Sequence, residues 1–168
     1  MSPLFRRKSS TPEIPGIRLE AGERVLARTS APEGAVVATT RHLVLPVDGM
    51  LEALRWETVE RARWDEGTEQ LVVVETAALG SRPRRHRIAV GREPRLLDVI
   101  REQVQASVIL TRHVPITERL GIRVTARRPP GGQRVSWAVA VDRGLDLDDP
   151  QVRARVDQAV TLVRAELE

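Results

Sequence analysis

The sequence predicts an α+β fold built mainly from antiparallel strands, and three observations support this. From Gly16 to Val90, short apolar runs recur about every 8–12 residues, with turn residues between them. From Glu93 the apolar residues change to the spacing of an amphipathic helix. After residue 112, a strong turn signal separates two further strand-like runs, and a second helical stripe follows.

Seven segments in the first part carry strand signals. Turns such as Pro32-Glu33-Gly34, Asp48-Gly49 and Asp65-Glu66-Gly67 separate several of them. The predicted strands are Arg24–Ala31, Ala35–Thr40, Arg41–Val47, Leu51–Trp56, Val59–Trp64, Gln70–Thr76 and Arg84–Val90. Six or seven short strands at this spacing predict an antiparallel barrel or a sandwich.

The segment from Glu93 to about Thr111 is predicted to form an amphipathic helix of about five turns. Pro94 stands in its first turn, where a missing backbone N–H costs nothing. The residues that repeat every fourth position are Leu96, Ile100, Val104 and Val108. Such a stripe needs a sheet or the mouth of a barrel to cover.

The rest of the chain predicts a hairpin followed by a helix. Ile122–Arg127 and Arg134–Val141 flank the turn Pro129-Pro130-Gly131-Gly132. Asp149 is a natural N-cap with Pro150 directly behind it, and valines at helical spacing follow.

These signals divide the chain into three parts. Residues 1–15 are polar, rich in Pro and without a period, which predicts a disordered tail. Residues 16–112 form the barrel with its capping helix, and residues 113–168 form an extension that is either separate or packed with the barrel as one domain. No run approaches the ~20 apolar residues of a membrane span, so we expect no integral membrane segment and a cytoplasmic location. The absence of Cys excludes disulfides and thiol chemistry and fits a reducing compartment.

Several short motifs carry a resemblance to a known family. They are Gly22-Glu23-Arg24-Val25-Leu26, then Thr39-Thr40-Arg41-His42-Leu43, and then Trp56 and Val59 before Trp64. In this order they resemble the motifs of bacterial pleckstrin-homology (PH)-like domains. The likeness is closest to uncharacterised members from high-GC Gram-positive bacteria and covers roughly residues 20–112. It implies a PH-like bent barrel of six to seven strands whose open end is capped by a C-terminal helix.

The resemblance implies no ligand residues for this chain. PH domains that bind phosphoinositides resemble one another in a basic cluster around the first hairpin loop. Here that loop, residues 29–34, holds one Glu and neither Lys nor Arg. We therefore expect no inositol-phosphate site at that place.

The positive charge is unevenly distributed. The net charge is +4, made by 26 Arg and one Lys, and this composition fits GC-rich codons. Residues 1–81 carry 10 basic and 12 acidic side chains (−2), residues 82–134 carry 13 and 4 (+9), and residues 135–168 carry 4 and 7 (−3). The basic block is either a solvated face with compositional arginine or a site for an anion.

The candidate anion- or partner-binding residues lie in this block. They are Arg82, Arg84, Arg85, Arg87, Arg92, Arg95, Arg127 and Arg128. Strand alternation places Arg85 and Arg87 on one face, which Arg127 adjoins at a strand end. Nucleic-acid surfaces usually add aromatic stacking, but Trp56, Trp64 and Trp137 stand in apolar strand contexts and are predicted to be core or barrel-lid residues.

The residues give little support to catalysis or to metal binding. His42, His86 and His113 each stand beside Arg and lack metal-ligand spacing. The acidic run Asp142, Asp146, Asp148 and Asp149 lacks the pattern of a calcium loop and predicts a solvated loop with a helix cap. We therefore predict no catalytic residues, no metal and no cofactor.

Three function classes follow from these observations. The leading hypothesis is a non-enzymatic interaction module that binds a protein partner or forms a homo-oligomer. The alternative is binding of a polyanion, either nucleic acid or an anionic membrane surface, through the arginine-rich segment 82–95. An enzyme of unknown reaction is the third class, and it requires histidines and carboxylates to meet in a cleft.

Overall fold

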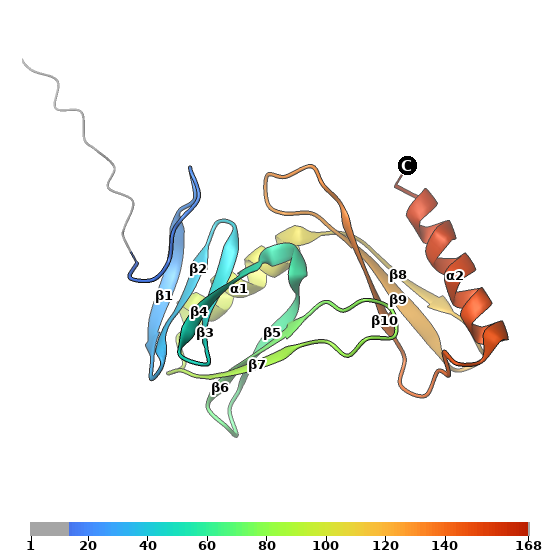
Figure 1. The fold of residues 1–168 in the computed structure, drawn as a ribbon, viewed down its shortest axis with the longest axis horizontal. Coiled ribbons are helices and arrows are strands. Elements are labelled where there is room, and N and C mark those ends of the chain that lie inside the picture. The colour runs from blue at the N-terminus through green and yellow to red at the C-terminus, as the bar shows by residue number, and fades with distance from the viewer. Residues whose placement is uncertain (1–13, 168) are drawn as a thin grey trace, which may run out of the picture.

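The computed structural model describes residues 14–167, which form two units joined side by side (Figure 1). The first unit contains β1 (Val25–Ala31), β2 (Gly34–Thr39), β3 (His42–Val47), β4 (Met50–Arg55), η1 (Trp56–Thr58), β5 (Val59–Asp65), β6 (Gln70–Glu75), β7 (Arg85–Ala89) and α1 (Pro94–Ser107). The second unit contains β8 (Val108–Pro115), β9 (Gly121–Arg127), β10 (Ser136–Val141) and α2 (Pro150–Ala165). All pairing between these strands is antiparallel, as the sequence predicts.

The first unit consists of a four-stranded sheet, β1-β2-β3-β4, and a three-stranded sheet, β5-β6-β7. Each of the seven strands lies within a residue or two of its predicted range. Trp56, Leu43 and Leu71 are fully buried between the sheets, and Leu96 and Ile100 of α1 complete this core. The predicted core positions of Trp56 and Trp64 are confirmed, since Trp64 packs against the same cluster.

The predicted barrel does not close. Within residues 14–167, no strand of the first sheet forms a backbone ladder with a strand of the second sheet. The chain passes from β4 to β5 through the short helix η1, and α1 packs against β1, β5 and η1. The Glu52–Arg84 ion pair connects β4 to the residue that precedes β7, and no backbone ladder joins these two strands. The first unit is therefore not a closed barrel but two facing sheets with a helix along one side, which is closer to the predicted sandwich than to the predicted barrel.

The outer face of the first sheet carries a smaller core. Val37 and Val44 are buried there because β2 and β3 are apolar on both faces. Ile14 covers them, is only 5% exposed and forms a β-bridge with Ile17. Of the predicted tail, residues 1–13 lie outside the described part, whereas Ile14 is packed rather than disordered.

α1 is shorter than predicted. It begins at Pro94, as expected, but ends at Ser107, and Val108 starts strand β8. The run Val-Ile-Leu-Thr favours a strand because β-branched and large apolar side chains pack well on a sheet. The four-residue spacing from Val104 to Val108 fits both structures, which explains the misplaced helix end.

The second unit is a three-stranded sheet, β10-β9-β8, with α2 packed on one face (Figure 1). Its core includes Ile122, Val124 and Val156, and Trp137 packs at its edge. The predicted hairpin and helix are confirmed, but β8 adds a third strand, and the boundary predicted between residues 112 and 113 falls inside it. Asp149 caps α2 as expected, since its carboxylate accepts the N–H of Gln151 at 2.8 Å.

The segment that links β6 to β7, residues 76–84, joins the two units. It extends away from the first unit and reaches the sheet of the second (Figure 1). Leu79 in this segment packs against the core of the second unit. None of the helices within residues 14–167 is long and apolar enough to span a bilayer.

Candidate anion-binding cleft

A cleft with a volume of about 990 Å³ lies between the two units. One wall is formed by β5, the end of β6 and residues 76–83, and the other by β9, β10 and the segment after them. Side chains alternate along β9, so Ile122, Val124 and Ala126 pack toward α2 while Arg123 and Arg127 lie on the opposite face. That opposite face lines the cleft.

The lining of the cleft is strongly basic. Arg61, Arg82, Arg123 and Arg143, the cleft arginines, are exposed and come from four different segments. In the part of the chain that the structure describes, none of the four forms an ion pair. Small residues such as Ala138 and Ala140 lie between them and leave the cleft open.

Two acidic residues, Glu60 and Asp142, also line the cleft. The Asp142 carboxylate is already engaged, because it accepts the N–H of Gly121 at 2.8 Å and lies 3.3 Å from Nε2 of His113. The Gly121 hydrogen bond and, after it, the contact with His113 hold the pKa of Asp142 below its ordinary value. The positive charge of Arg123 is a smaller cause of this lowered pKa, and the four cleft arginines outnumber the two carboxylates.

Arg127 lines the same cleft but has a structural role. It is only 5% exposed, and its guanidinium donates to the carbonyl oxygens of Val59 at 2.8 Å and Glu60 at 3.0 Å. A third bond goes to the hydroxyl of Ser107 at 3.0 Å. Burial lowers the pKa of Arg127, and the negative charge of Glu60 partly opposes this. Arg127 thus connects the β8-β9-β10 sheet to β5. It is buried, whereas the sequence predicts that it adjoins an exposed basic face.

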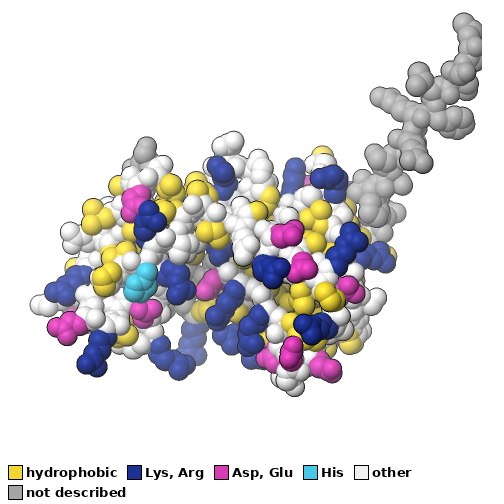
Figure 2. Space-filling model, turned by 180° about the vertical axis from the view of Figure 1, so that it is seen from behind, with side chains coloured by type: hydrophobic (Ala, Val, Ile, Leu, Met, Phe, Trp, Pro, Cys, Tyr) yellow, Lys and Arg dark blue, Asp and Glu magenta, His cyan; other side chains and the backbone are white. Residues whose placement is uncertain are grey.

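The basic lining continues onto the outer face of the β5-β6-β7 sheet. The strand register places Arg61, Val74 and Arg85 in one row across the sheet, and Arg63, Val72 and Arg87 in the next. Arg63 lies 3.6 Å from Asp65, whereas Arg85 and Arg87 have no ion-pair partner within residues 14–167. Figure 2 shows Arg side chains gathered in the lower middle of the molecule, seen from the side opposite to Figure 1.

The candidate arginines predicted from the sequence do not form a single site. Arg85 and Arg87 share a face, as strand alternation predicts, and Arg82 lies in the cleft. Arg84 is committed to Glu52, with contacts of 2.7 and 3.0 Å, and these hydrogen bonds raise its pKa. The remaining members lie elsewhere: Arg92 is 3.6 Å from Glu66, Arg95 is exposed in the first turn of α1, and Arg128 is exposed after β9.

The sequence reasoning missed three of the cleft arginines, namely Arg61, Arg123 and Arg143. A signal existed for Arg123, because it alternates with the apolar residues Ile122 and Val124 in a strand that was predicted. Arg61 was harder to place, since the alternation along Val59–Trp64 does not reveal which face is buried. Arg143 lies in a loop, and only the tertiary fold brings it to the cleft.

Each histidine lies beside a carboxylate, and His42 also lies 3.9 Å from a second one, that of Glu20. His42 Nδ1 is 2.8 Å from Glu23, His86 Nε2 is 2.6 Å from Glu75, and His113 Nε2 is 3.3 Å from Asp142. The three pairs lie on three different sheets. Nowhere in residues 14–167 do three histidines or carboxylates come together in a way that could hold a metal ion.

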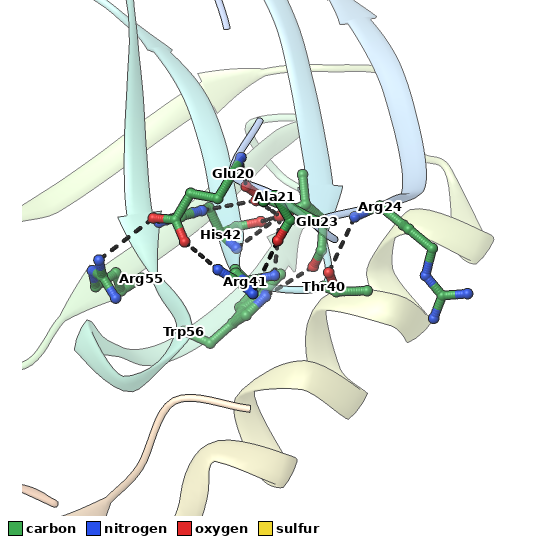
Figure 3. Close-up of polar contacts among 10 residues, drawn as sticks. Glu20, Ala21, Glu23, Arg24, Thr40, Arg41, His42, Arg55 and Trp56 are labelled. Carbon is green, nitrogen blue, oxygen red and sulfur yellow. Dashed lines mark hydrogen bonds and ion pairs between the residues drawn. The ribbon is translucent and has the colours of Figure 1, made fainter. Parts of the chain in front are cut away.

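The most buried of these pairs is part of a polar cluster at one end of the first sheet (Figure 3). The Glu23 side chain is 1% exposed and accepts hydrogen bonds from the Thr39 hydroxyl and from the N–H of Glu20, the latter at 2.8 Å. Burial raises the pKa of Glu23, but the hydrogen bonds from Thr39, Glu20 and His42 outweigh it, so the pKa lies below its ordinary value.

The hydroxyl of Thr39 is fully engaged in this cluster. It donates to Glu23 and accepts the backbone N–H groups of Arg41 at 3.1 Å and His42 at 2.8 Å. The indole of Trp56 donates to the Thr39 carbonyl oxygen at 3.0 Å. Because no lone pair of this hydroxyl is left to attack a substrate, the cluster fixes the β2–β3 turn rather than forming a nucleophile.

The fold and the cleft together define a mainly antiparallel β protein with an arginine-lined cleft between two α+β units. Comparison with known protein families, curated proteins and solved structures found no match to this chain. The resemblance to PH-like domains therefore stays a prediction from the sequence motifs.

Proposed function

We propose that the protein is a non-enzymatic binding module that holds a polyanion in its arginine cleft. One observation carries the proposal: four arginines from separate segments line one cleft, and none has an ion-pair partner among the described residues. Like charges that are gathered without partners repel one another. An anionic ligand would relieve this repulsion and would gain hydrogen bonds from each guanidinium.

The chemistry of the cleft favours binding over catalysis. Arginine stays protonated in proteins, so the cleft arginines offer fixed charge and donors but no proton-accepting group. Their planar guanidinium groups match phosphate and carboxylate oxygens in a bidentate manner. The predicted polyanion-binding function is thereby moved from the segment 82–95 to the cleft, where Arg82 is the shared residue.

The test compares binding of three probes: a 20-base-pair DNA duplex, a single-stranded RNA and phosphatidylserine vesicles. Fluorescence anisotropy or vesicle sedimentation is measured over a range of salt concentrations. We expect R82Q/R123Q/R143Q to weaken binding at least about tenfold and to reduce the slope of log K against log salt for DNA by about 2 to 3. The probe that binds most tightly identifies the source of the anionic groups.

A matched control removes the same charge elsewhere. Arg18, Arg24 and Arg28 are exposed, lie away from the cleft lining and lack ion-pair partners within the described residues. We expect R18Q/R24Q/R28Q to retain most of the affinity. The proposal fails if none of the three probes binds, or if both triple variants weaken binding equally.

A further inference from the structure

Strand β7 is an open edge of the β5-β6-β7 sheet. Within residues 14–167 it pairs only with β6. The N–H of Glu75 donates to the carbonyl oxygen of Arg84 at 2.9 Å, and residues in an antiparallel pair alternate between groups that face the partner and groups that face away. The backbone N–H and C=O groups of Arg85, Arg87 and Ala89 therefore face away from β6, and no described strand pairs with them.

A groove with a volume of about 610 Å³ runs along this edge and includes every residue of β7. Its opposite wall is formed by the turn residues Ala31–Glu33 and by Pro46–Asp48. These residues belong to the ends of two hairpins, and Pro46 lacks a backbone N–H. The groove therefore presents one strand edge, that of β7, whose outward backbone groups are not paired with any described strand, while β3 lies close to part of β7.

The two faces of β7 differ in character, which determines the side chains that an added strand would need. On the outer face, Arg85 and Arg87 are exposed and have no acidic partner among the described residues. On the inner face, Ile88 is part of the core, and His86 is buried. Side chains of a paired strand alternate in the same way, so acidic residues fit the outer face and apolar residues fit the inner face.

Charges on the inner side of the groove are already paired or are negative. Arg84 is paired with Glu52 and with Oε1 of Glu75, and the same Oε1 atom lies 2.6 Å from Nε2 of His86. Glu33 and Asp48 lie on the opposite wall and repel a carboxylate there. An acidic side chain is thus favoured only beside Arg85 and Arg87.

A second copy of the chain is a poor occupant of this edge. Antiparallel pairing of two β7 strands would bring Arg85 and Arg87 of one copy next to the same residues of the other, and like charges on neighbouring strands are destabilising. An acidic partner strand would instead be attracted to Arg85 and Arg87. The charge on the outer face therefore favours a different chain over self-association.

We propose that the β7 edge binds an extended peptide, with acidic and apolar residues at alternating positions, by strand addition. This site goes beyond the arginine cleft, because Arg85 and Arg87 are not among the residues that line the cleft. It also gives the expected protein-partner function a specific surface. The peptide would supply the strand that lies against β7 and would pair its carboxylates with the two arginines.

The test uses a fluorescein-labelled peptide of seven residues in which Glu alternates with Val. Two peptides serve as comparisons: one with the same composition but its Glu residues clustered, and one with alternate backbone nitrogens methylated. Methylation removes N–H donors without changing charge or side chains. We expect the alternating peptide to bind at least about tenfold more tightly than either comparison peptide, because ladder hydrogen bonds and alternation both contribute.

Variants of the protein locate the site. We expect R85E/R87E to weaken binding of the alternating peptide by at least about tenfold, and A89P to weaken it by removing an outward N–H that β6 does not use. Circular dichroism and thermal unfolding establish that each variant is folded, and the methylated peptide tests the same hydrogen bonds on the unchanged protein. The cleft variant R82Q/R123Q/R143Q should bind the peptide normally, which separates this proposal from the proposed function.

Equal binding of the methylated and unmethylated peptides would overturn strand addition and leave charge attraction alone. Equal binding of the clustered and the alternating peptides would overturn the requirement for acidic residues at alternating positions. A dimer that A89P abolishes in sedimentation, together with no peptide binding, would overturn the proposal in favour of self-pairing.

Discussion

The strongest test of the packing between the two units is the substitution Arg127→Met. Methionine retains much of the length and apolar volume of the side chain but removes the guanidinium. Three hydrogen bonds are lost, and the carbonyl oxygens of Val59 and Glu60 lose their bonds to Arg127. Bonds from a charged donor contribute about 1.5 kcal/mol or more each, or about 4.5 kcal/mol for three. The substitution also removes the desolvation penalty of the buried charge, which offsets part of this loss. We therefore expect the free energy of unfolding to fall by about 3 kcal/mol.

Urea unfolding followed by circular dichroism measures this loss. In a chain of this size, about 3 kcal/mol corresponds to a fall in Tm of about 6–12 °C. Hydrogen exchange should show faster opening in β5 and β9, the strands that Arg127 joins. The control is Arg123→Met, four residues earlier on the same face of β9 but exposed, for which we expect a change within about 0.5 kcal/mol. Equal stability of the two variants would refute the structural role of Arg127.

Three further predictions concern stability. Because the pKa of Glu23 lies below its ordinary value of 4.5, its ionised form stabilises the fold above about pH 4.5, and this contribution is lost as the pH falls through the folded-state pKa. Unfolding free energies measured from about pH 6 to 3 should therefore fall more steeply for the unchanged protein than for E23Q. Gly121→Ala places a Cβ against the carbonyl oxygen of Val114, so thermal unfolding should show a loss of about 2 kcal/mol or more. Asp149→Ala removes the cap of α2 and should cost about 1 kcal/mol, with faster hydrogen exchange in its first turn.

Each of these predictions has a matched control. A parallel pH dependence of E23Q and the unchanged protein would contradict the role of the Glu23 carboxylate. Gly67→Ala should be nearly neutral, because its Cβ would meet only an ordinary contact of 3.5 Å with Asp65. Asp148→Ala leaves the α2 cap intact, so an effect as large as that of Asp149→Ala would count against capping.

The strands and the second helix could be predicted because their signals are local. Turn residues mark the end of β3 and the start of β6, and Asp149-Pro150 marks the start of α2. The end of α1 was misplaced because Val108 fits both a helical stripe and a strand. Closure of a barrel could not be decided from the sequence, since it depends on whether the edges of two sheets meet in space.

The cleft could be predicted only in part for a related reason. A sequence rich in arginine offers no local feature that separates the buried Arg127 from the exposed Arg128 next to it. The difference arises because Arg127 lies opposite the carbonyl oxygens of Val59 and Glu60, more than 60 residues earlier in the chain. Arg82 was predicted as a candidate, but its companions in the cleft come from other segments. Tertiary contacts of this kind have no signature in spacing or composition.

The position of Leu79 has a consequence for how the chain can be divided. This residue belongs to the first unit by sequence, yet it fills part of the core beneath α2. A fragment that begins at residue 113 would lose Leu79, the first half of β8 and the contacts of Arg127 with β5. Part of the hydrophobic core of the second unit is thus supplied by a residue of the first unit. Its folding should depend on the earlier segment being present, whatever length of chain is chosen for expression.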